Sequence, residues 1–253
     1  MGDYDSLVSA AAAVPLHGWD FGWLAGRAVT AEPSWRYPDL ALGLLRDADR
    51  VLDIDTGGGE LLATLSPPAG RTWAAESWPP NVSVASRRLA PLGVTVVGTE
   101  ELPFPDREFS LVLNRHGRFD AAGIARVLAF GGTVLTQQVG SDDCVDLNHA
   151  LGAPVTDRHW NLDVATEALA AAGLEILDAK EEWPLLTFHD IGAVVYQLRM
   201  VPWQVPDFSV PRYDQALRRL HSRIEADGPF AVRTHRFLIR AWKRDERSSA
   251  TGG

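Results

Sequence analysis

The residues with the clearest chemical potential lie in one stretch, VLDIDTGGGE (residues 51–60), where an apolar run leads directly into three glycines. Glycine carries no side chain, so a ligand can approach the backbone of Gly57, Gly58 and Gly59 closely. In an open α/β sheet, the turn after a strand's carboxyl end lies at the edge where ligands bind. This stretch is therefore a candidate ligand loop, and a tight turn without a ligand is the alternative.

Negative charge crowds the same loop, because Asp53, Asp55 and Glu60 lie within it. A dinucleotide fingerprint would need a third glycine for close helix packing, and Leu62 and Ala63 follow instead. A pyrophosphate would be repelled by these carboxylates, whereas S-adenosylmethionine brings a sulfonium and an ammonium group against one carboxylate. The loop therefore favours a cationic ligand of this kind.

A further carboxylate, Glu76, ends the next apolar run, TWAAE (residues 72–76). Folds of this type place an acidic side chain about twenty residues after the glycine loop, where it accepts hydrogen bonds from ribose hydroxyls. The glycine loop and Glu76 together thus indicate a nucleoside ligand. A solvated strand end is the alternative for Glu76.

These side chains need a scaffold that brings strand ends to one edge, and short apolar runs alternate with helix-compatible segments as such a scaffold requires. We predict an α/β fold, a doubly wound, mostly parallel Rossmann-like sheet with helices on both faces and an antiparallel last strand. Strands are expected at residues 50–55, 72–76, 94–98, 109–114, 132–139 and 174–188, with an antiparallel edge strand at 230–243. Helices are expected at residues 82–93, 121–132, 162–173, 190–203 and 213–228.

The chain has 253 residues, 46% of them hydrophobic, which is enough to bury a full core, and no linker-like stretch interrupts it. We therefore predict a single domain over residues 1–243. Its expected parts are an N-terminal helical cap (1–46), a cofactor-binding core (47–140) and a substrate-side C-terminal half (141–243). The polar tail RDERSSATGG (244–253) is predicted to be disordered.

Composition argues against several other classes of function. The formal net charge of -9 disfavours nucleic acid as a partner, because phosphate binding depends on Lys and Arg. The single cysteine, Cys144, excludes an internal disulfide and a multi-cysteine zinc site, and the seven histidines show no ligand spacing, so no metal is expected. An acidic N-terminal lead argues against a signal peptide or membrane span, so we expect a cytoplasmic monomer or homodimer.

Two later segments carry a family resemblance. TEELPFPDREFSLVLNRH (99–116) and IARVLAFGGTVLTQQVG (124–140) resemble motifs of the class I S-adenosylmethionine-dependent methyltransferases, and the likeness extends over about residues 51–140. WRYPDL (35–40) and HDIGAVVYQLRMVPWQVP (189–206) resemble a bacterial branch of the small-molecule, type 11-like enzymes, distantly similar to ribosomal RNA guanine methyltransferases.

The resemblance implies S-adenosylmethionine as the cofactor and assigns roles to matching positions. The methionine moiety would face the first loop, the ribose would lie against the second strand end, and adenine would follow the third. The resemblance assigns Asp53, Gly57, Gly58 and Gly59 to the methionine moiety and Glu76 to the ribose. It assigns Thr99 and Glu100 to the adenine, and it places Asn114 beside the methyl group.

Two positions depart from the family pattern. Asp55 stands where the first loop glycine is expected, and Gly98 stands where an aspartate usually reads the adenine amino group. Aspartate tolerates left-handed backbone geometry, so the turn is expected to survive, and its charge could contact the cofactor's ammonium. The adenine amino group would need another acceptor, for which Glu100 is the candidate.

Methyl transfer is an in-line displacement that depends mainly on positioning, and a general base helps when the acceptor must lose a proton. His116, just after the expected fourth strand, is the candidate base, and a surface loop histidine is the alternative. His189 and His17 are weaker candidates. Arg115 could bind an acidic substrate or form only a salt bridge.

The leading interpretation is methyl transfer to a small-molecule acceptor. Methylation of RNA is the alternative within the class, but the acidic charge and the lack of a cysteine-rich zinc module weigh against it. A protein that binds S-adenosylmethionine without transferring its methyl group is a third interpretation, motivated by Asp55 and Gly98. A nicotinamide dehydrogenase is the most distant one.

Overall fold

The computed structural model describes residues 3–16, 20–155 and 159–244, and the chain divides into two compact units. We call them the three-stranded unit and the seven-stranded unit, after their sheets. Each has hydrophobic core clusters of its own, as an independent unit requires. The three-stranded unit comprises Met1–Pro33, Ser141–Arg158 and Glu182–His235; the seven-stranded unit comprises Ser34–Gly140, His159–Glu181 and Arg236–Gly253.

This division differs from the three consecutive segments that the sequence indicated. The three-stranded unit takes its residues from the first and last of the three expected segments, whereas the seven-stranded unit takes residues from all three. The expected disordered tail lies outside the described residues from position 245 onward, as does His17.

The seven-stranded unit is built on a sheet with the strand order β4-β3-β2-β5-β6-β10-β7. Neighbouring strands from β4 to β6 pair in parallel, and β10 pairs antiparallel with β6. The predicted fold class is therefore confirmed, including the antiparallel last strand. The strands are β2 (Val51–Ile54), β3 (Thr72–Glu76), β4 (Val94–Gly98), β5 (Phe109–Arg115), β6 (Leu128–Val139), β7 (Leu174–Glu182) and β10 (Arg236–Lys243).

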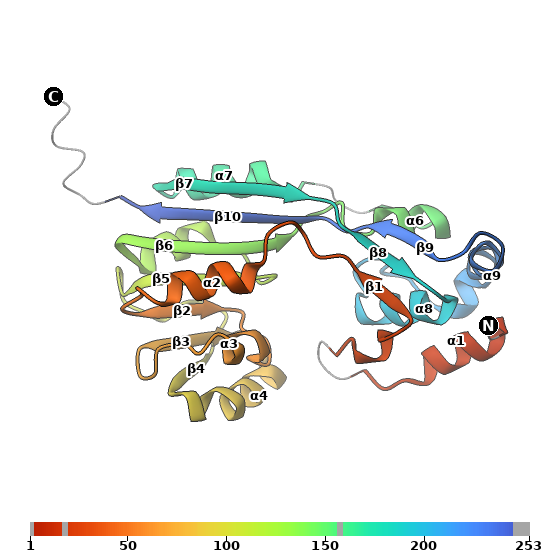
Figure 1. Cartoon of the computed structure of the whole chain (residues 1–253), viewed down its shortest axis with the longest axis horizontal. Helices are drawn as coiled ribbons and strands as arrows, with labels where there is room; N and C mark the ends of the chain where they lie inside the picture. Colours follow the sequence, from red (N-terminus) through yellow and green to blue (C-terminus); the bar gives the residue numbers. More distant parts are fainter. Residues whose placement is uncertain (1–2, 17–19, 156–158, 245–253) are drawn as a thin grey trace. The chain divides into compact units, whose positions relative to one another are not determined.

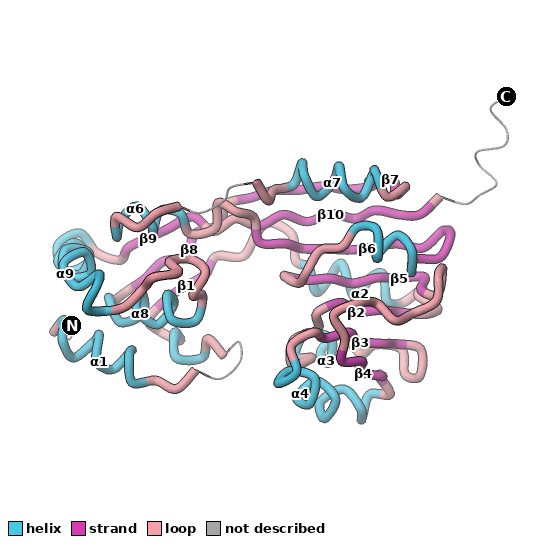
Figure 2. Tube along the Cα trace, turned by 180° about the vertical axis from the view of Figure 1, so that it is seen from behind, coloured by secondary structure: helices cyan, strands magenta, loops and turns pink. Residues whose placement is uncertain are grey.

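Helices cover both faces of this sheet (Figures 1 and 2). On one face, α2 (Tyr37–Leu45) packs over Leu111, Leu113 and Leu135, while α3 (Glu60–Thr64) and α4 (Pro79–Leu89) cover β3 and β4. On the other face, α5 (Ala121–Val127) and α7 (Leu162–Ala171) pack over the central strands. A 3-10 turn, η2 (Ala90–Leu92), continues α4. Alternating strand residues face opposite sides, so this two-sided cover explains the nearly continuous apolar runs.

Helix α5 is shorter than the sequence suggested. Asp120 caps its start by accepting a hydrogen bond from the Gly123 backbone N–H at 3.0 Å, as an N-cap aspartate does. The expected helix over 121–132 ends at Val127, and β6 begins at once with Leu128. Leu128 and Val127 are both fully buried, and an apolar run of this kind cannot distinguish a buried helix from a buried strand.

Two expected strands are wrong in their extent. Residues 174–188 form β7 and, after Trp183 and Pro184, a separate strand β8 (Leu185–Phe188) in the other sheet. Proline has no backbone N–H to donate to a strand ladder, so it interrupts the pairing. Residues 230–243 likewise form β9 (Phe230–Arg233) and β10, and β10 lies between β6 and β7, so it is not the edge strand.

The three-stranded unit has an antiparallel sheet in the order β1-β8-β9, with β1 at Ala28–Thr30. A strand therefore occurs within the part expected to be a helical cap. Helix α8 (Ile191–Met200) is almost entirely buried in the core of this unit. The other helices of the unit are α1 (Tyr4–Ala13), η1 (Gly22–Leu24), α6 (Val145–Leu151) and α9 (Val210–Asp227).

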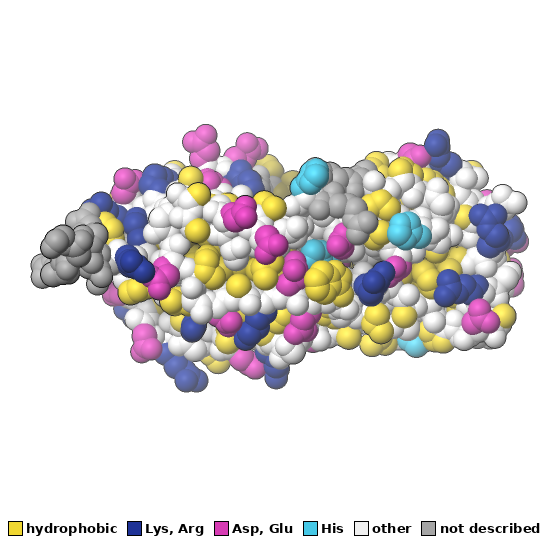
Figure 3. Space-filling view, turned by 90° about the horizontal axis from the view of Figure 1, so that it is seen from above, with side chains coloured by type: hydrophobic (Ala, Val, Ile, Leu, Met, Phe, Trp, Pro, Cys, Tyr) yellow, Lys and Arg dark blue, Asp and Glu magenta, His cyan; other side chains and the backbone are white. Residues whose placement is uncertain are grey.

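Charged side chains of both signs are interspersed on the visible face of the seven-stranded unit, at the left of Figure 3. Among the described residues, none of the helices combines the length and the hydropathy needed to span a lipid bilayer.

Candidate functional site at the carboxyl edge of the seven-stranded sheet

The carboxyl ends of β2, β3, β4 and β5 bring most of the predicted site residues together. Hydrogen bonds join the loops that follow these strands: the Gly57 N–H donates to Glu76, and the Thr99 N–H donates to the Glu76 backbone oxygen at 2.9 Å. The side chain of Asn114 donates to the Ile54 carbonyl at 3.2 Å. The structure thus places residues that are far apart in sequence on one connected edge.

The three loop glycines serve different purposes. Gly59 has φ +79° and precedes α3, and a Cβ there would lie 2.8 Å from the side chain of Leu89, so helix α4 packs directly on it. The carbonyl of Gly58 accepts a hydrogen bond from Arg88, which also pairs with Glu60. Gly57 has φ +63°, and a Cβ there would meet no atom within 4 Å, so its backbone faces open space.

Glu76 is 4% exposed, and both of its carboxylate oxygens accept hydrogen bonds from backbone N–H groups. Oε2 accepts from Gly57 at 2.7 Å, and Oε1 accepts from Trp78 at 2.8 Å. A carboxylate oxygen has two lone pairs, so each can accept a second hydrogen bond. Glu76 therefore ties the glycine loop to the end of β3 while keeping acceptor capacity for a ligand.

Asp53 is a half-buried carboxylate of β2, just before the same loop. Its pKa is raised from 3.8 to about 7, chiefly by burial and further by the negative charges of Asp55 and Glu76, while the Thr56 hydroxyl acts in the opposite direction. Burial disfavours a charge that has no counter-ion, so a cationic ligand nearby would restore the ionised form. The group is thus suited to a ligand that carries an ammonium.

Asp55 adopts the left-handed conformation with φ +54°, which confirms that the turn tolerates aspartate in place of glycine. Its Oδ2 accepts a hydrogen bond from the Arg118 backbone N–H at 2.5 Å. A Cβ on Gly117 would lie 2.6 Å from the Asp55 Cβ, so the loop after β5 passes very close to it. Asp55 therefore binds the loop after β2 to the loop after β5, and its predicted contact with an ammonium stays a prediction.

Asn114 is fully buried, and its amide is saturated with protein partners. Nδ2 donates to the carbonyls of Ile54 and Arg118, at 3.2 and 3.4 Å, and Oδ1 accepts from Thr136 at 3.0 Å and from Gln138 at 2.6 Å. An amide with two donors and one carbonyl oxygen has little capacity left after these four bonds. Asn114 therefore holds β2, β5 and β6 together, and its position beside a methyl group stays a prediction.

We expect Asn114→Ala to lower the free energy of unfolding by about 2–4 kcal/mol, because the buried side chains of Thr136 and Gln138 lose the acceptor that they share. Urea unfolding followed by circular dichroism measures the change. Thr95→Ala, at an exposed position of edge strand β4, is the control and should change the stability by less than about 0.5 kcal/mol. Equal stabilities for Asn114→Ala and the wild type would contradict a structural role for this amide.

The residues expected at the adenine lie after β4. The Thr99 hydroxyl is engaged with the backbone of Glu101, and the side chain of Glu100 is exposed. A Cβ on Gly98 would lie 3.3 Å from both methyl groups of Val82, so α4 approaches β4 closely there. Glu100 thus keeps a free approach from solvent, and its role as an adenine acceptor stays a prediction.

His116 follows β5 with φ +58°, and the residue is exposed although protein atoms surround much of its ring. Burial holds the pKa of the His116 imidazole well below its usual 6.5, and the charges of Arg115 and Arg236 act in the same direction. The direction of this shift favours the neutral ring. Its Nε2 lies 2.8 Å from Nε2 of Gln137, whose Oε1 accepts a hydrogen bond from the Trp35 indole at 2.8 Å.

Sequence reasoning missed Gln137, and it noted Trp35 only as part of the WRYPDL segment, without a partner. Gln137 lies in the middle of an expected strand, where a single polar residue is unremarkable, and Trp35 is 102 positions away along the chain. No local signal links the two. The only hint was that QQ follows an otherwise apolar run, which leaves polar side chains to be satisfied inside a buried sheet.

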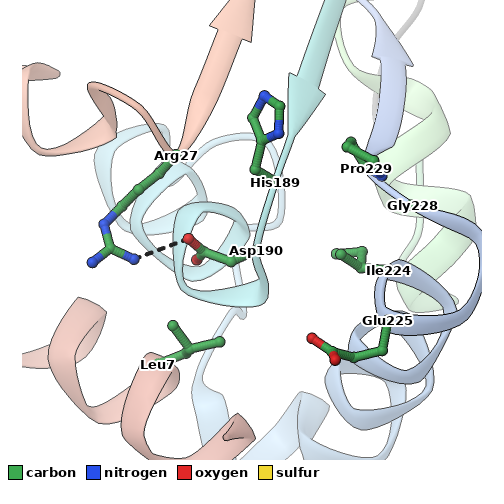
Figure 4. A pocket seen from close by; sticks show the side chains of 8 residues that line it. All are labelled: Leu7, Arg27, His189, Asp190, Ile224, Glu225, Gly228 and Pro229. Atoms are coloured by element: carbon green, nitrogen blue, oxygen red, sulfur yellow. Dashed lines mark hydrogen bonds and ion pairs between the residues drawn. The ribbon is translucent and has the colours of Figure 1, made fainter. Parts of the chain in front are cut away.

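His189 belongs to a different place, a pocket of about 510 Å³ within the three-stranded unit (Figure 4). On one side of this pocket Arg27 donates to Asp190 at 2.9 Å, and Asp190 also caps α8 by accepting from the Ala193 N–H. The charged pair thus has a structural role in this unit. His189 does not share the compact unit that contains the glycine loop and His116.

No protein-family model matches the chain, and a search of curated proteins found no match. Solved structures share its fold. A protein from Bacillus halodurans assigned as a methyltransferase aligns with a TM-score of 0.59 and 20% identity, over 82% of this chain and 97% of its own. The [4+2]-cyclase SpnF aligns at 0.54 and 18%, over 95% and 93%. A protein from Galdieria sulphuraria assigned as a sarcosine dimethylglycine methyltransferase aligns at 0.51 and 16%, over 88% and 85%.

At these identities the likeness defines the fold. The chain shares the Rossmann-like fold of these solved methyltransferase structures, with a seven-stranded, mostly parallel sheet and one antiparallel strand. A cyclase among the neighbours shows that proteins with this fold do not all carry out one reaction. Function must therefore be argued from the carboxyl edge itself.

Proposed function

We propose that the protein binds S-adenosylmethionine at the carboxyl edge of the seven-stranded sheet and transfers its methyl group to a small molecule. One observation carries the proposal: the buried Glu76 carboxylate is joined to a glycine loop whose Gly57 backbone faces open space. A ligand that offers paired hydroxyls to Glu76 and backbone acceptors to the loop fits this arrangement.

The residues present suit the cofactor's chemical groups. Glu76 can accept hydrogen bonds from ribose hydroxyls while it holds the loop, and Asp53 offers negative charge to the ammonium. Glu100 offers an exposed acceptor to the adenine. When bound, the cofactor supplies an electrophilic methyl group on a sulfonium; the chain's part is to bind, orient and neutralise charge.

We expect the protein to bind S-adenosylmethionine or S-adenosylhomocysteine with low-micromolar to sub-millimolar affinity, about 5 to 8 kcal/mol. Isothermal titration calorimetry and thermal-shift measurements on the full chain test this. The absence of both heat and a thermal shift at millimolar ligand would reject the cofactor assignment. Binding of NADH in place of either ligand would favour a dehydrogenase instead.

Binding without methyl transfer is the second candidate function. The cyclase neighbour supports it, since that fold accommodates a reaction of another kind. Production of S-adenosylhomocysteine in a screen of small-molecule acceptors favours transfer. Binding with no product across the screen and across RNA favours the second candidate. Mixed surface charge and the net charge of -9 support a small molecule over RNA.

A further inference from the structure

A three-residue hydrogen-bond chain lies where β5 and β6 end. Trp35 Nε1 donates to Gln137 Oε1 at 2.8 Å, and Gln137 Nε2 lies 2.8 Å from His116 Nε2. Trp35 and Gln137 are only 5% and 3% exposed, so water does not compete for the first link. The chemistry of the three groups therefore decides which atom donates at each link.

The three-residue hydrogen-bond chain has only one consistent assignment of donors and acceptors. An indole N–H can only donate, so Gln137 turns its carbonyl oxygen to Trp35 and its NH2 group to His116. An NH2 group can also only donate, so His116 Nε2 accepts with its lone pair. A neutral imidazole then carries its single proton on Nδ1.

The ring is held firmly in this role. The His116 backbone N–H donates to the Gln137 backbone oxygen at 2.7 Å, so main chain and side chain of Gln137 both bind the same residue. Turning the Gln137 amide over would set its NH2 group against the Trp35 N–H and leave two donors facing each other. Leaving such buried donors unpaired costs about 1–3 kcal/mol each.

We propose that Trp35 and Gln137 hold His116 as a hydrogen-bond donor through Nδ1–H, and that this N–H, with Arg115 and Arg236, binds an anionic carboxylate or phosphate group of the methyl acceptor. The donor role stands on the hydrogen-bond chain alone, whereas the acceptor group rests on the proposed function. A general-base role, which the sequence position suggested, is disfavoured because Nε2 is occupied and Nδ1 is protonated.

The pairing of β5, β6 and β10 places two arginines on the face of the sheet that carries Gln137. Arg115 pairs with Gln137 across β5 and β6, and Leu238 of β10 pairs with Gln137 on the other side. Arg236 lies two residues before Leu238, so Arg115, Gln137 and Arg236 share one face of the sheet. The charges of Arg115 and Arg236 both act on the His116 ring. Such a neighbourhood attracts an anionic group.

The donor role is tested by nitrogen-15 NMR of the histidine side chains in the ligand-free protein. The His116 signals are assigned by their loss in His116→Gln. We expect a ring protonated on Nδ1 at pH 7, and a ring protonated on Nε2 would overturn the proposal. This measurement needs neither cofactor nor acceptor, so it stands apart from the test of methyl transfer.

Two variants and a matched control test the positioning. In Gln137→Glu the carboxylate accepts from both Trp35 and His116, so the proton should move to Nε2. Trp35→Phe removes the donor that orients Gln137 and should give a mixture of tautomers. Tyr37→Phe removes a buried hydroxyl from the same core. This hydroxyl is not part of the three-residue hydrogen-bond chain, so the tautomer should stay unchanged. An unchanged tautomer in both Gln137→Glu and Trp35→Phe would overturn the positioning role.

The anionic group is tested with sodium acetate and inorganic phosphate as probes, at constant ionic strength, in the presence of S-adenosylhomocysteine. A saturable shift of the His116 Nδ1 signal by either anion supports the proposal and distinguishes a carboxylate from a phosphate. We expect Gln137→Glu to weaken that binding at least about tenfold and to keep S-adenosylhomocysteine affinity within about threefold. Methylammonium serves as the cationic control probe. The proposal would be overturned if only methylammonium shifted the signal, if none of the probes shifted it, or if Gln137→Glu lost its S-adenosylhomocysteine affinity.

Discussion

Asp53→Asn is expected to stabilise the protein above about pH 7 and to weaken S-adenosylmethionine binding at the same pH. Burial raises the pKa of the Asp53 carboxyl to about 7 in the folded protein, against 3.8 for the free group. The folded state therefore resists ionisation of this group, and asparagine has no charge to bury.

The sign follows from proton linkage. Between about pH 4 and pH 7 the folded protein holds the Asp53 proton and the unfolded chain does not, so the contribution of this group to stability falls as pH rises. Above pH 7 this contribution to stability is lost completely. The loss is at most about 4 kcal/mol, because each unit of difference between the folded and unfolded pKa is worth about 1.4 kcal/mol. The gain from Asp53→Asn should thus be largest above pH 7 and small below pH 4.

Thermal unfolding of wild type and Asp53→Asn from pH 4 to pH 8.5 measures this difference. Asp47→Asn is the control, because Asp47 is an exposed carboxylate of the same unit. Parallel stability curves for wild type and Asp53→Asn would show that Asp53 titrates normally. On the ligand side, calorimetry at pH 8 should show S-adenosylmethionine affinity reduced about tenfold or more, the scale of a lost charge-assisted contact.

Glu76→Ala is expected to weaken cofactor binding by about 1.5 to 3 kcal/mol, close to tenfold to a hundredfold in dissociation constant. The change removes the acceptor proposed for the ribose. It also frees the backbone N–H groups of Gly57 and Trp78, which Glu76 holds at 2.7 and 2.8 Å, so the glycine loop loses its fixed position. Calorimetry with S-adenosylhomocysteine measures the loss, and circular dichroism checks that the fold is retained.

Glu60→Ala is the matched control for Glu76→Ala. Glu60 belongs to the same loop, but its side chain is exposed and pairs with Arg88. We expect its removal to change the cofactor affinity by less than about threefold. Equal losses in the two variants would mean that the loop needs only negative charge, and an unchanged affinity in Glu76→Ala would leave Glu76 as a strand-end carboxylate.

Local pattern was sufficient for the parts of the chain whose structure depends on neighbouring residues. Apolar runs of strand length predicted β2, β3, β4 and β5 closely, and the alternation with helical segments predicted the fold class. The glycine loop and Glu76 were found because a turn after a strand must lie at the carboxyl edge. The left-handed conformation of Asp55 followed from the backbone tolerance of aspartate.

Contacts between distant residues decided the rest. Residues 174–188 and 230–243 each supply strands to two sheets, and hydrophobic pattern alone does not say which strand pairs with which. Asn114 reads as a free amide at a strand end until four partners from three other segments saturate it. His116 reads as a free loop imidazole until the structure places its Nε2 2.8 Å from Nε2 of Gln137, whose Oε1 accepts from Trp35. The sequence determined which residues reach the carboxyl edge of the sheet. Tertiary hydrogen bonding determined which of their atoms can still bind a ligand, because the unused donors and acceptors of a side chain depend on the groups packed around it.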